Sequence, residues 1–330
     1  MSLRALPSPI RVAVVGVGYL GKFHARKYAL RPEAKLVAVS DTNPETARRI
    51  AQENQCEAVG DFRDLIGRVD AVSVVVPTQA HAAVAEPLLE AGIHCLVEKP
   101  FASTLEEAER LSALAARKGV VLQVGHLERF NPVWTACRPL MRSPLFIEAH
   151  RLAGFTERGL DVDVVMDLMI HDLDLCLSLF ADRPLTLVHA VGVPVLSPSI
   201  DIANARLVFE GGAVANLTAS RVSVEPIRKF RVFQPDAYLS LDLQARTADI
   251  VRMETDAENG QKRLSGQRVH KDEKADALES EIADFLGAVA GRHPVSVGPE
   301  SGLAAMRLAD QLRRQISSNP DLQRLLGQRG

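Results

Sequence analysis

Residues 11–125 alternate between two kinds of sequence pattern, and this alternation constrains the fold more than any other feature. Short runs of β-branched and other apolar residues recur, each followed by a stretch with helical spacing of apolar residues. Runs that are apolar at every position are typical of strands buried on both faces, as in a parallel sheet covered by helices. We expect strands at 11–15, 35–40, 71–76, 94–98 and 120–124, with helices at 19–30, 44–55, 79–91 and 105–118.

The pattern changes after Gly125. An apolar helix is expected at 164–180, followed by runs in which apolar and polar residues alternate, as in a sheet with one open face. The expected strands are 185–196, 202–209, 213–221, 229–234, 238–243 and 249–254. We expect an exposed hairpin or loop at 256–275 and helices at 275–290 and 300–317. The chain therefore reads as α/β, with an N-terminal doubly wound parallel sheet (1–125) and a C-terminal α+β domain (126–330) whose sheet is largely antiparallel.

Composition excludes several classes of protein. A net charge of −2 gives no reason to expect a nucleic-acid or anionic membrane partner. No apolar stretch reaches the roughly 20 residues that a membrane span needs. The four cysteines are scattered, without a CxxC pair or a nearby histidine at ligand spacing, so we expect no metal site and a reducing, cytoplasmic setting.

A glycine-rich turn, Gly16-Val17-Gly18-Tyr19-Leu20-Gly21, directly follows the first expected strand and opens a helix. In a dinucleotide-binding loop the first glycine permits the tight turn, the second lets the backbone approach the pyrophosphate, and the third lets helix and strand pack closely. Asp41 ends the second expected strand, 20 residues after Gly21, where an acid accepts hydrogen bonds from the ribose hydroxyls. No arginine follows at Thr42 to receive a 2′-phosphate, which favours NAD over NADP. The alternative is a turn without a nucleotide, in which Asp41 caps a helix.

Polar residues also follow the expected strands 71–76 and 94–98. Lys99 stands in Glu98-Lys99-Pro100 at the carboxyl end of a strand, where ligands of such folds bind. An ammonium there can stabilise the oxyanion that develops as a hydride leaves, whereas in isolation it would be a solvated surface group. The candidate cofactor contacts are Gly16, Gly18, Tyr19, Leu20, Gly21, Asp41, Thr42, Pro77, Thr78, His81, Glu98 and Lys99, with packing or capping as the alternative for His81.

Three ionisable residues, Asp167, His171 and Asp174, are spaced i, i+4 and i+7 and so share one face of the expected helix. A carboxylate one turn from an imidazole favours one tautomer and makes the histidine a better general base. The alternative is a polar stripe satisfied by an internal salt bridge or by water. Three such groups on an apolar helix are costly unless they face a cavity, which favours a functional site.

Three motifs together resemble the glucose–fructose oxidoreductase, inositol dehydrogenase and MocA family: Gly16-x-Gly18-x-x-Gly21-x-x-His24, Glu98-Lys99-Pro100 and Asp167-x-x-x-His171. The resemblance covers nearly the whole chain. It implies that Lys99 and His171 are the catalytic pair and that Asp167 is a partner of the histidine or of the substrate. It also implies an open sheet through which the chain forms homodimers or homotetramers.

Several segments are similar to one branch of that family, the UDP-N-acetylglucosamine 3-dehydrogenases associated with lipid A biosynthesis; they are 125–132, 148–152, 167–172, 201–206 and 233–238. This similarity implies oxidation of the 3-hydroxyl of a nucleotide sugar. Arginine forks suit the pyrophosphate of such a substrate, and the candidate substrate contacts are Lys99, Arg129, Asn131, Arg151, Arg158, Asp167 and His171. Two alternatives stay open: a dehydrogenase of a free polyol or sugar, and an NAD-binding sensor without turnover.

Overall fold

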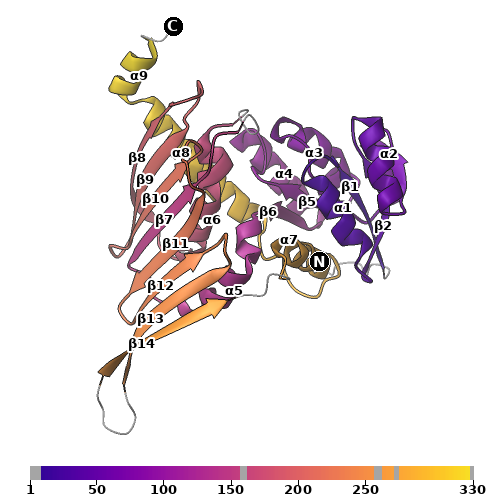
Figure 1. Cartoon of the computed structure of the whole chain (residues 1–330). Coiled ribbons are helices and arrows are strands. Elements are labelled where there is room, and N and C mark those ends of the chain that lie inside the picture. The colour runs from indigo at the N-terminus through magenta and orange to yellow at the C-terminus, as the bar shows by residue number, and fades with distance from the viewer. Residues whose placement is uncertain (1–8, 157–161, 256–261, 271–274, 328–330) are drawn as a thin grey trace. The chain divides into compact units, whose positions relative to one another are not determined.

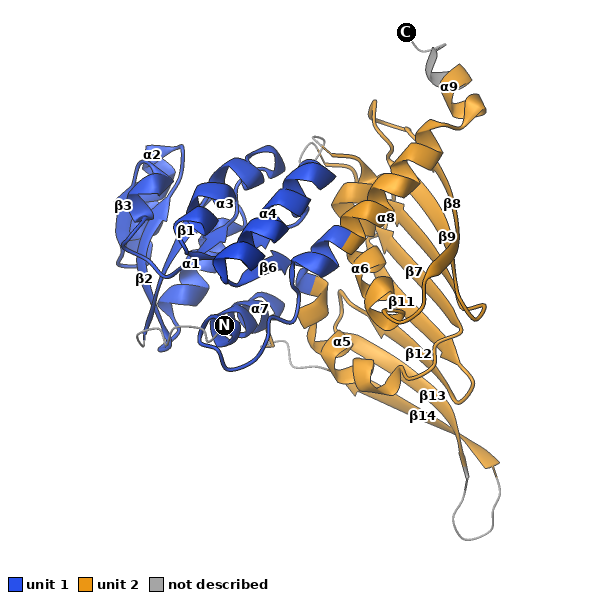
Figure 2. Ribbon diagram, turned by 180° about the vertical axis from the view of Figure 1, so that it is seen from behind, with its two compact units in different colours: residues 1–127, 277–303 blue, residues 128–276, 304–330 orange. Residues whose placement is uncertain are grey.

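The computed structural model describes residues 9–156, 162–255, 262–270 and 275–327, and the chain forms two compact units (Figures 1 and 2). Unit 1 comprises residues 1–127 and 277–303, and unit 2 comprises residues 128–276 and 304–330. The chain therefore returns to unit 1 near its C-terminal end, a return that the expected two-part division at residue 125 does not contain.

Unit 1 is built on a six-stranded parallel sheet in the order β3-β2-β1-β4-β5-β6. Four of its strands are buried at nearly every position, which confirms the prediction of a doubly wound parallel sheet. The short β3 was not expected, because three residues with one buried side chain carry little pattern. The strands are β1 (Ile10–Val15), β2 (Ala34–Ser40), β3 (Glu57–Val59), β4 (Ala71–Val74), β5 (His94–Glu98) and β6 (Leu122–Gly125).

Local signals set the ends of the helices in unit 1, as α4 shows best. Thr104 caps α4 in a capping box, in which its hydroxyl accepts from the backbone N–H of Glu107 and the Glu107 carboxylate accepts from the N–H of Thr104. Gly119 ends the helix with a left-handed φ of 66°. The helices are α1 (Gly21–Ala29), α2 (Pro44–Glu53), α3 (His81–Glu90) and α4 (Leu105–Lys118), with short 3₁₀ turns at 62–65 and 78–80.

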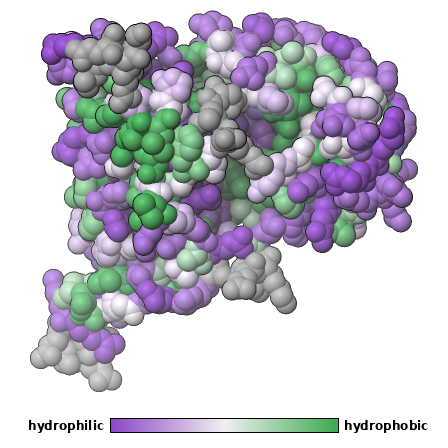
Figure 3. Space-filling view, turned by 45° about the horizontal axis from the view of Figure 1, so that its top comes forward, coloured by the Kyte–Doolittle hydropathy of each residue, from purple (hydrophilic) through white to green (hydrophobic). Residues whose placement is uncertain are grey.

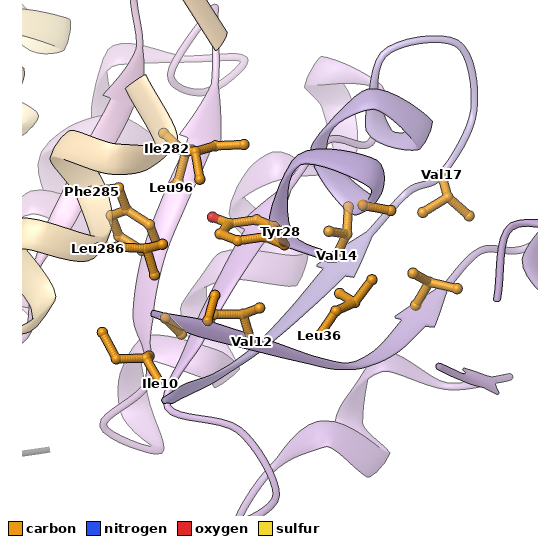
Figure 4. Close-up of a cluster of buried hydrophobic side chains, with 14 of the residues drawn as sticks. Ile10, Val12, Val14, Val17, Tyr28, Leu36, Leu96, Ile282, Phe285 and Leu286 are labelled. Carbon is orange, nitrogen blue, oxygen red and sulfur yellow. The ribbon is translucent and has the colours of Figure 1, made fainter. Parts of the chain in front are cut away.

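The helix α7 (Ala277–Val289) belongs to unit 1 because its apolar side chains enter the core of the parallel sheet. Ile282, Phe285 and Leu286 are fully buried and join a cluster with Ile10 and Val12 of β1 (Figure 4). The expected division placed this helix in the second domain; its amphipathic pattern shows that one face is buried but does not show which sheet covers it.

Unit 2 is built on an eight-stranded sheet in the order β14-β13-β12-β11-β7-β10-β9-β8. Only β7 and β10 pair in parallel and the other neighbours are antiparallel, which confirms the predicted largely antiparallel sheet. Its strands are β7 (Phe146–Leu152), β8 (Leu185–Val193), β9 (Ile202–Phe209), β10 (Val214–Ser220), β11 (Ile227–Gln234), β12 (Ala237–Asp242), β13 (Thr247–Thr255) and β14 (Lys262–His270).

The segment expected to be one helix at 164–180 consists of two kinds of helix. A π-helical turn at Val165–Met169 precedes α6 (Ile170–Leu179), so the prediction of an uninterrupted α-helix is wrong over these five residues. Asp163 caps the start, since its carboxylate accepts from the N–H groups of Val165 and Met166 at 3.0 and 3.2 Å. α6 packs on β7 and β10.

The remaining helices are α5 (Pro132–Cys137), α8 (Pro299–Ser317), which runs from unit 1 into unit 2, and α9 (Pro320–Gly327), with 3₁₀ turns at 127–130 and 138–140. Within the described ranges, no helix has both the length and the hydropathy that crossing a membrane requires.

The unit 2 sheet has one buried face and one open face, because buried and partly exposed residues alternate along β7, β9, β10 and β12. On β8 the open face carries Leu187, Val191 and Val193, each about half exposed at 50%, 45% and 49%. Apolar patches interrupt the polar surface seen in Figure 3. An open face with this many apolar side chains is a candidate protein–protein surface.

We expect Phe285→Ala to lower the free energy of unfolding by about 3–5 kcal/mol, because it leaves a cavity in the core under α7. The measurement is urea unfolding followed by circular dichroism. Phe23→Ala is the matched control, because Phe23 lies on α1 of the same unit and is 39% exposed, so its loss should cost less than ~1 kcal/mol. Equal losses in the two variants would contradict the assignment of α7 to this core.

Candidate functional site

The glycine loop between β1 and α1 has the shape that a dinucleotide needs. Gly16 has a φ of 83°, and a Cβ there would lie 2.5 Å from the carbonyl oxygen of Val75. A Cβ on Gly21 would lie 1.8 Å from the carbonyl oxygen of Gly16, so α1 packs against the strand end as the motif predicts. A Cβ on Gly18, in contrast, would meet nothing within 4 Å, which leaves this side of the loop open to a phosphate.

Asp41 holds the glycine loop from the end of β2. One oxygen of its carboxylate accepts from the N–H of Val17 at 2.8 Å, and the other accepts from the N–H of Asn43 at 2.9 Å. Asn43, not Asp41, caps α2, because its side chain accepts from the N–H groups of Glu45 and Thr46. The carboxylate is half-buried beside the loop and has lone pairs left for ribose hydroxyls. The loop and this acid together fit NAD.

The loops after β4 and β5 carry the other candidate contacts. Pro77 is exposed, while Thr78 and Lys99 are half-buried. Ser103 donates its hydroxyl to the carbonyl of Thr78 at 3.2 Å, which ties the two loops together. Thr78 and Lys99 thus stand on neighbouring, connected loops at the carboxyl ends of parallel strands, the edge at which ligands of such sheets bind.

His81 lies beneath these loops and not at their surface. It is 1% exposed, with Nδ1 2.8 Å from the carbonyl oxygen of Pro100 and Nε2 2.9 Å from that of Val76. Burial lowers the pKa of the imidazole, although both carbonyls oppose this shift. The position corresponds to the packing alternative, in which His81 joins the loop after β4 to the turn that carries Lys99.

Glu98 also points away from the edge, although the sequence suggested that it contacts the cofactor. The residue is 8% exposed, and its carboxylate approaches Nε2 of His24 within 3.3 Å. Its other oxygen accepts from the backbone N–H of Lys99 at 3.2 Å. The side chain therefore contacts α1 and the backbone of its own loop.

The predicted face of Asp167, His171 and Asp174 is divided between two environments. Asp167 in the π-helical turn and His171 in the first turn of α6 are both half-buried. Asp174 is 2% exposed and accepts from Nε and Nη2 of Arg129 at 2.7 and 3.2 Å. The internal salt bridge left open as the alternative therefore applies to Asp174.

Arg151 forms a buried ion network in unit 2. It lies on β7, is 3% exposed, and donates to both carboxylate oxygens of Asp172 at 2.9 and 2.8 Å and to Glu128 at 2.8 Å. Burial raises the pKa of Asp172 even though Arg151 opposes this. For Glu128, burial would also raise the pKa, but the charge and hydrogen bond of Arg151, the hydrogen bond of Asn131 and the charge of Arg228 together outweigh it and lower the pKa. The guanidinium thus donates to two carboxylates and is buried, so it is not available to bind a substrate pyrophosphate.

The other candidate substrate contacts differ in their surroundings. Asn131 is 6% exposed, caps α5 by accepting from Val133, and donates to Glu128 and to the carbonyl of Leu243. Its contacts are structural. Arg129 is half-buried beside Asp174, and Arg158 lies outside the described residues.

The sequence reading missed the partners of Arg151. Along β7, Ile147, Ala149 and Arg151 alternate onto the buried face of the sheet, so recognising this strand would have predicted that Arg151 is buried and requires a carboxylate. No strand was expected at 146–152, so the burial of Arg151 was not predicted. In the described part of the chain, no three His, Cys, Asp or Glu side chains are arranged to hold a metal ion.

Comparison with known proteins gives two family matches. Residues 10–126 match the model GFO_IDH_MocA, described as an oxidoreductase family with an NAD-binding Rossmann fold. Residues 143–238 match the model of the GFO/IDH/MocA C-terminal domain. The resemblance drawn from the motifs and the prediction of an NAD-binding Rossmann fold are confirmed.

Individual relatives agree with these matches. The chain is 43% identical over 310 residues to UDP-N-acetylglucosamine 3-dehydrogenase of Acidithiobacillus ferrooxidans, covering 94% of this chain and 98% of that relative. A solved structure of that enzyme superposes with a TM-score of 0.86 at 41% identity, covering 94% of this chain and 98% of the other. scyllo-Inositol 2-dehydrogenase (NAD⁺) of Bacillus subtilis is 30% identical over 65% of this chain and 68% of its own length.

We expect Arg151→Ala to destabilise the protein by about 3–5 kcal/mol, because it leaves Asp172 buried without its ion-pair partner and leaves Glu128 only the half-exposed Arg228 at 3.9 Å. The loss should be smaller at pH 5 than at pH 8, since protonation removes the uncompensated charge. Arg231→Ala is the control, because its pair with Glu148 is about one third exposed and should contribute roughly 0–1 kcal/mol. Urea unfolding at the two pH values measures both; a pH-independent loss would contradict the network.

Proposed function

Because the chain belongs to the GFO/IDH/MocA family of NAD-binding oxidoreductases, we propose that it oxidises the 3-hydroxyl of UDP-N-acetylglucosamine to a ketone, with NAD as hydride acceptor. The observation that carries this proposal is the 43% identity, over nearly the full length of both chains, to an enzyme of that activity. The 3-keto sugar nucleotide would serve an aminotransferase in lipid A biosynthesis.

The cofactor would be held by unit 1. The backbone of the Gly16–Gly21 loop and the N-terminus of α1 suit its pyrophosphate, and Asp41 suits its ribose. Tyr19 and Leu20 lie within this loop, Thr42 follows Asp41, and Pro77 and Thr78 lie in the loop after β4. When bound, NAD⁺ supplies the nicotinamide ring that accepts the hydride from C3 of the sugar.

Lys99 and His171 are the proposed acid–base pair. As the C3 hydride leaves, the O–H bond at the same carbon breaks, and His171 takes that proton as a general base. The ammonium of Lys99 donates a hydrogen bond to the oxygen and stabilises the negative charge that develops there before the C=O bond is complete. Asp167, close to His171 in the chain, is the proposed partner that orients the imidazole or the sugar.

Arg129 and Arg158 are the proposed cationic contacts for the substrate pyrophosphate, because a guanidinium fork matches phosphate oxygens. Arg151 and Asn131, which the sequence also suggested, are not part of this proposal, because both are buried among structural partners. An arginine that contacts phosphate should affect KM for the nucleotide sugar more than kcat.

We further propose that the chain forms a homodimer or homotetramer through the open face of the unit 2 sheet. Exposed apolar residues on β8 support this, together with a stacked group of Phe146, Phe233 and Tyr238 on β7, β11 and β12. The four free cysteines support a reducing, cytoplasmic location.

The substrate assignment predicts NADH formation, read at 340 nm, with UDP-N-acetylglucosamine and at least ~100-fold lower kcat/KM with free N-acetylglucosamine, because the free sugar lacks the binding energy of the nucleotide. A free polyol is the second candidate, favoured by the 30% identity to an inositol dehydrogenase, and myo- and scyllo-inositol belong in the same assay. Turnover of an inositol without turnover of any nucleotide sugar would reverse the order of the two candidates. No turnover of any of these would favour an NAD-binding sensor.

Lys99→Ala and His171→Ala should each lower kcat by about 10²-fold or more, because each removes a group that acts only as charge and proton move. The Kd of NAD, measured by fluorescence or calorimetry, should stay within about twofold for His171→Ala. Lys229→Ala is the control for loss of a half-buried lysine, since Lys229 pairs with Asp242 on the unit 2 sheet. Wild-type kcat in His171→Ala would mean that another residue is the base.

A further inference from the structure

Three titratable side chains from distant parts of the sequence are buried in unit 1 and have no role in the hydride chemistry described above. They are His24 on α1, Glu98 at the end of β5 and Glu281 on α7, with exposed fractions of 0%, 8% and 0%. Ionisable groups are rarely buried, because each loses its hydration. Their accumulation beneath the edge that carries Lys99 requires an explanation.

The carboxylate of Glu98 is enclosed on several sides. His24 Nε2 lies 3.3 Å from one oxygen, and the backbone N–H of Lys99 donates to the other at 3.2 Å. A Cβ on Gly125, at the end of the neighbouring β6, would lie 2.9 Å from the carboxyl carbon and 3.0 Å from each oxygen. The carboxylate therefore lies directly on the backbone of Gly125, and a larger residue there would displace it.

Glu281 completes this cluster from α7. Neither of its carboxyl oxygens has a hydrogen-bond partner among the described residues, and its own backbone carbonyl accepts from the side chain of Gln123 at 3.2 Å. Burial raises the pKa of Glu281 well above its ordinary value of 4.5, and the charges of Glu98 and Asp284 add to this. Burial raises the pKa of Tyr28 on α1, and the charge of Glu281 adds to that shift.

The pKa values of the two buried carboxyl groups shift in opposite directions for a physical reason. For Glu98, burial alone would raise the pKa, but the contacts and charges of His24 and Lys99 together outweigh burial and lower it. For Glu281, burial and the charge of Glu98 both raise the pKa. Of the two groups, Glu98 therefore ionises more readily, and its side chain accepts from the backbone N–H of Lys99.

We propose that Glu98 is a positioning residue that fixes the backbone of Lys99 for proton-coupled hydride transfer, and that His24 and Gly125 hold its carboxylate in place. This inference rests on the proposed function, in which Lys99 contacts the reacting oxygen. A small displacement of such a group is enough to lower kcat while leaving cofactor binding intact.

The first test compares Glu98→Gln and Gly125→Ala with Lys99→Ala. Glu98→Gln and Gly125→Ala should each lower kcat at least ~10-fold while the Kd of NAD stays within about twofold. Glu98→Gln should also shift the pH profile of kcat, because it removes a charge beside Lys99, whereas Gly125→Ala keeps that charge and should shift it less. Glu86→Gln is the matched control, since Glu86 lies on α3 of the same unit with a side chain 39% exposed, and its kcat should equal that of the wild type.

The outcomes distinguish the positioning role of Glu98 from the proposed role of Lys99. Loss of activity in Lys99→Ala with wild-type kcat in both Glu98→Gln and Gly125→Ala would overturn the positioning role and leave the proposed function standing. Wild-type kcat in Lys99→Ala would overturn the proposed role of Lys99, and the positioning role with it.

The second test needs no activity. A group whose pKa is higher in the folded state contributes stability at pH values below its unfolded pKa and loses it as the pH rises through the folded value. The Tm of Glu281→Gln relative to wild type should therefore increase as the pH rises above the ordinary carboxyl value of 4.5 and become constant above the folded pKa, because glutamine cannot ionise. A Tm difference that is constant from pH 5 to 9 would show that folding does not raise the pKa of Glu281.

Discussion

The close packing of α1 on the end of β1 is the constraint on which the rest of unit 1 depends. It exists because position 21 has no side chain, since a Cβ there would meet the carbonyl of Gly16 at 1.8 Å. Once α1 begins at this point, His24 is buried one turn later beside Glu98. Tyr28, a further turn along, places its hydroxyl 2.8 Å from that of Ser73 on β4. The absence of a side chain at Gly21 thus determines both the shape of the cofactor loop and the surroundings of Glu98.

Elements whose ends are encoded by adjacent residues could be predicted from the sequence. The bounds of α4 agree with expectation because a capping box and a left-handed glycine are local features. β5 and β9 also agree with expectation, since uninterrupted or strictly alternating patterns define them. α7 could be recognised as a helix, but its place in unit 1 could not be, because it packs on residues such as Ile10 and Val12 of β1, at the other end of the chain.

The candidate site was harder to predict for a related reason. Spacing along a helix shows which residues share a face, but it does not show what opposes that face. Asp174 and Asp172 both face cations that come from elsewhere in the sequence, Arg129 and Arg151. The glycine loop and Asp41 are different, because their function depends mostly on backbone geometry within about 25 residues. This difference explains why the sequence predicted the geometry around the glycine loop and Asp41 better than it predicted the partners of Asp172 and Asp174.

Buried charge is handled differently in the two units. In unit 2, Arg151 carries its full charge between two carboxylates, so three charged groups share one network. In unit 1, burial and the charges of Glu98 and Asp284 raise the pKa of Glu281, which has no cation against it among the described residues. Burial raises the pKa of one carboxyl group in each unit, Asp172 and Glu281, and in unit 2 the guanidinium of Arg151 opposes this shift.

The π-helical turn at Val165–Met169 has a consequence for how this segment can vary among related chains. A π-helix has more residues per turn than an α-helix, as if one residue had been inserted. Deleting one residue from this turn would restore α-helical geometry with little net rotation of the flanking residues, because five residues of π-helix turn roughly as far as four of α-helix. A deletion between Asp167 and His171 would shorten their spacing along the chain by one position. Chains of this kind that differ by one residue here should therefore not be aligned on Asp167 by sequence position alone.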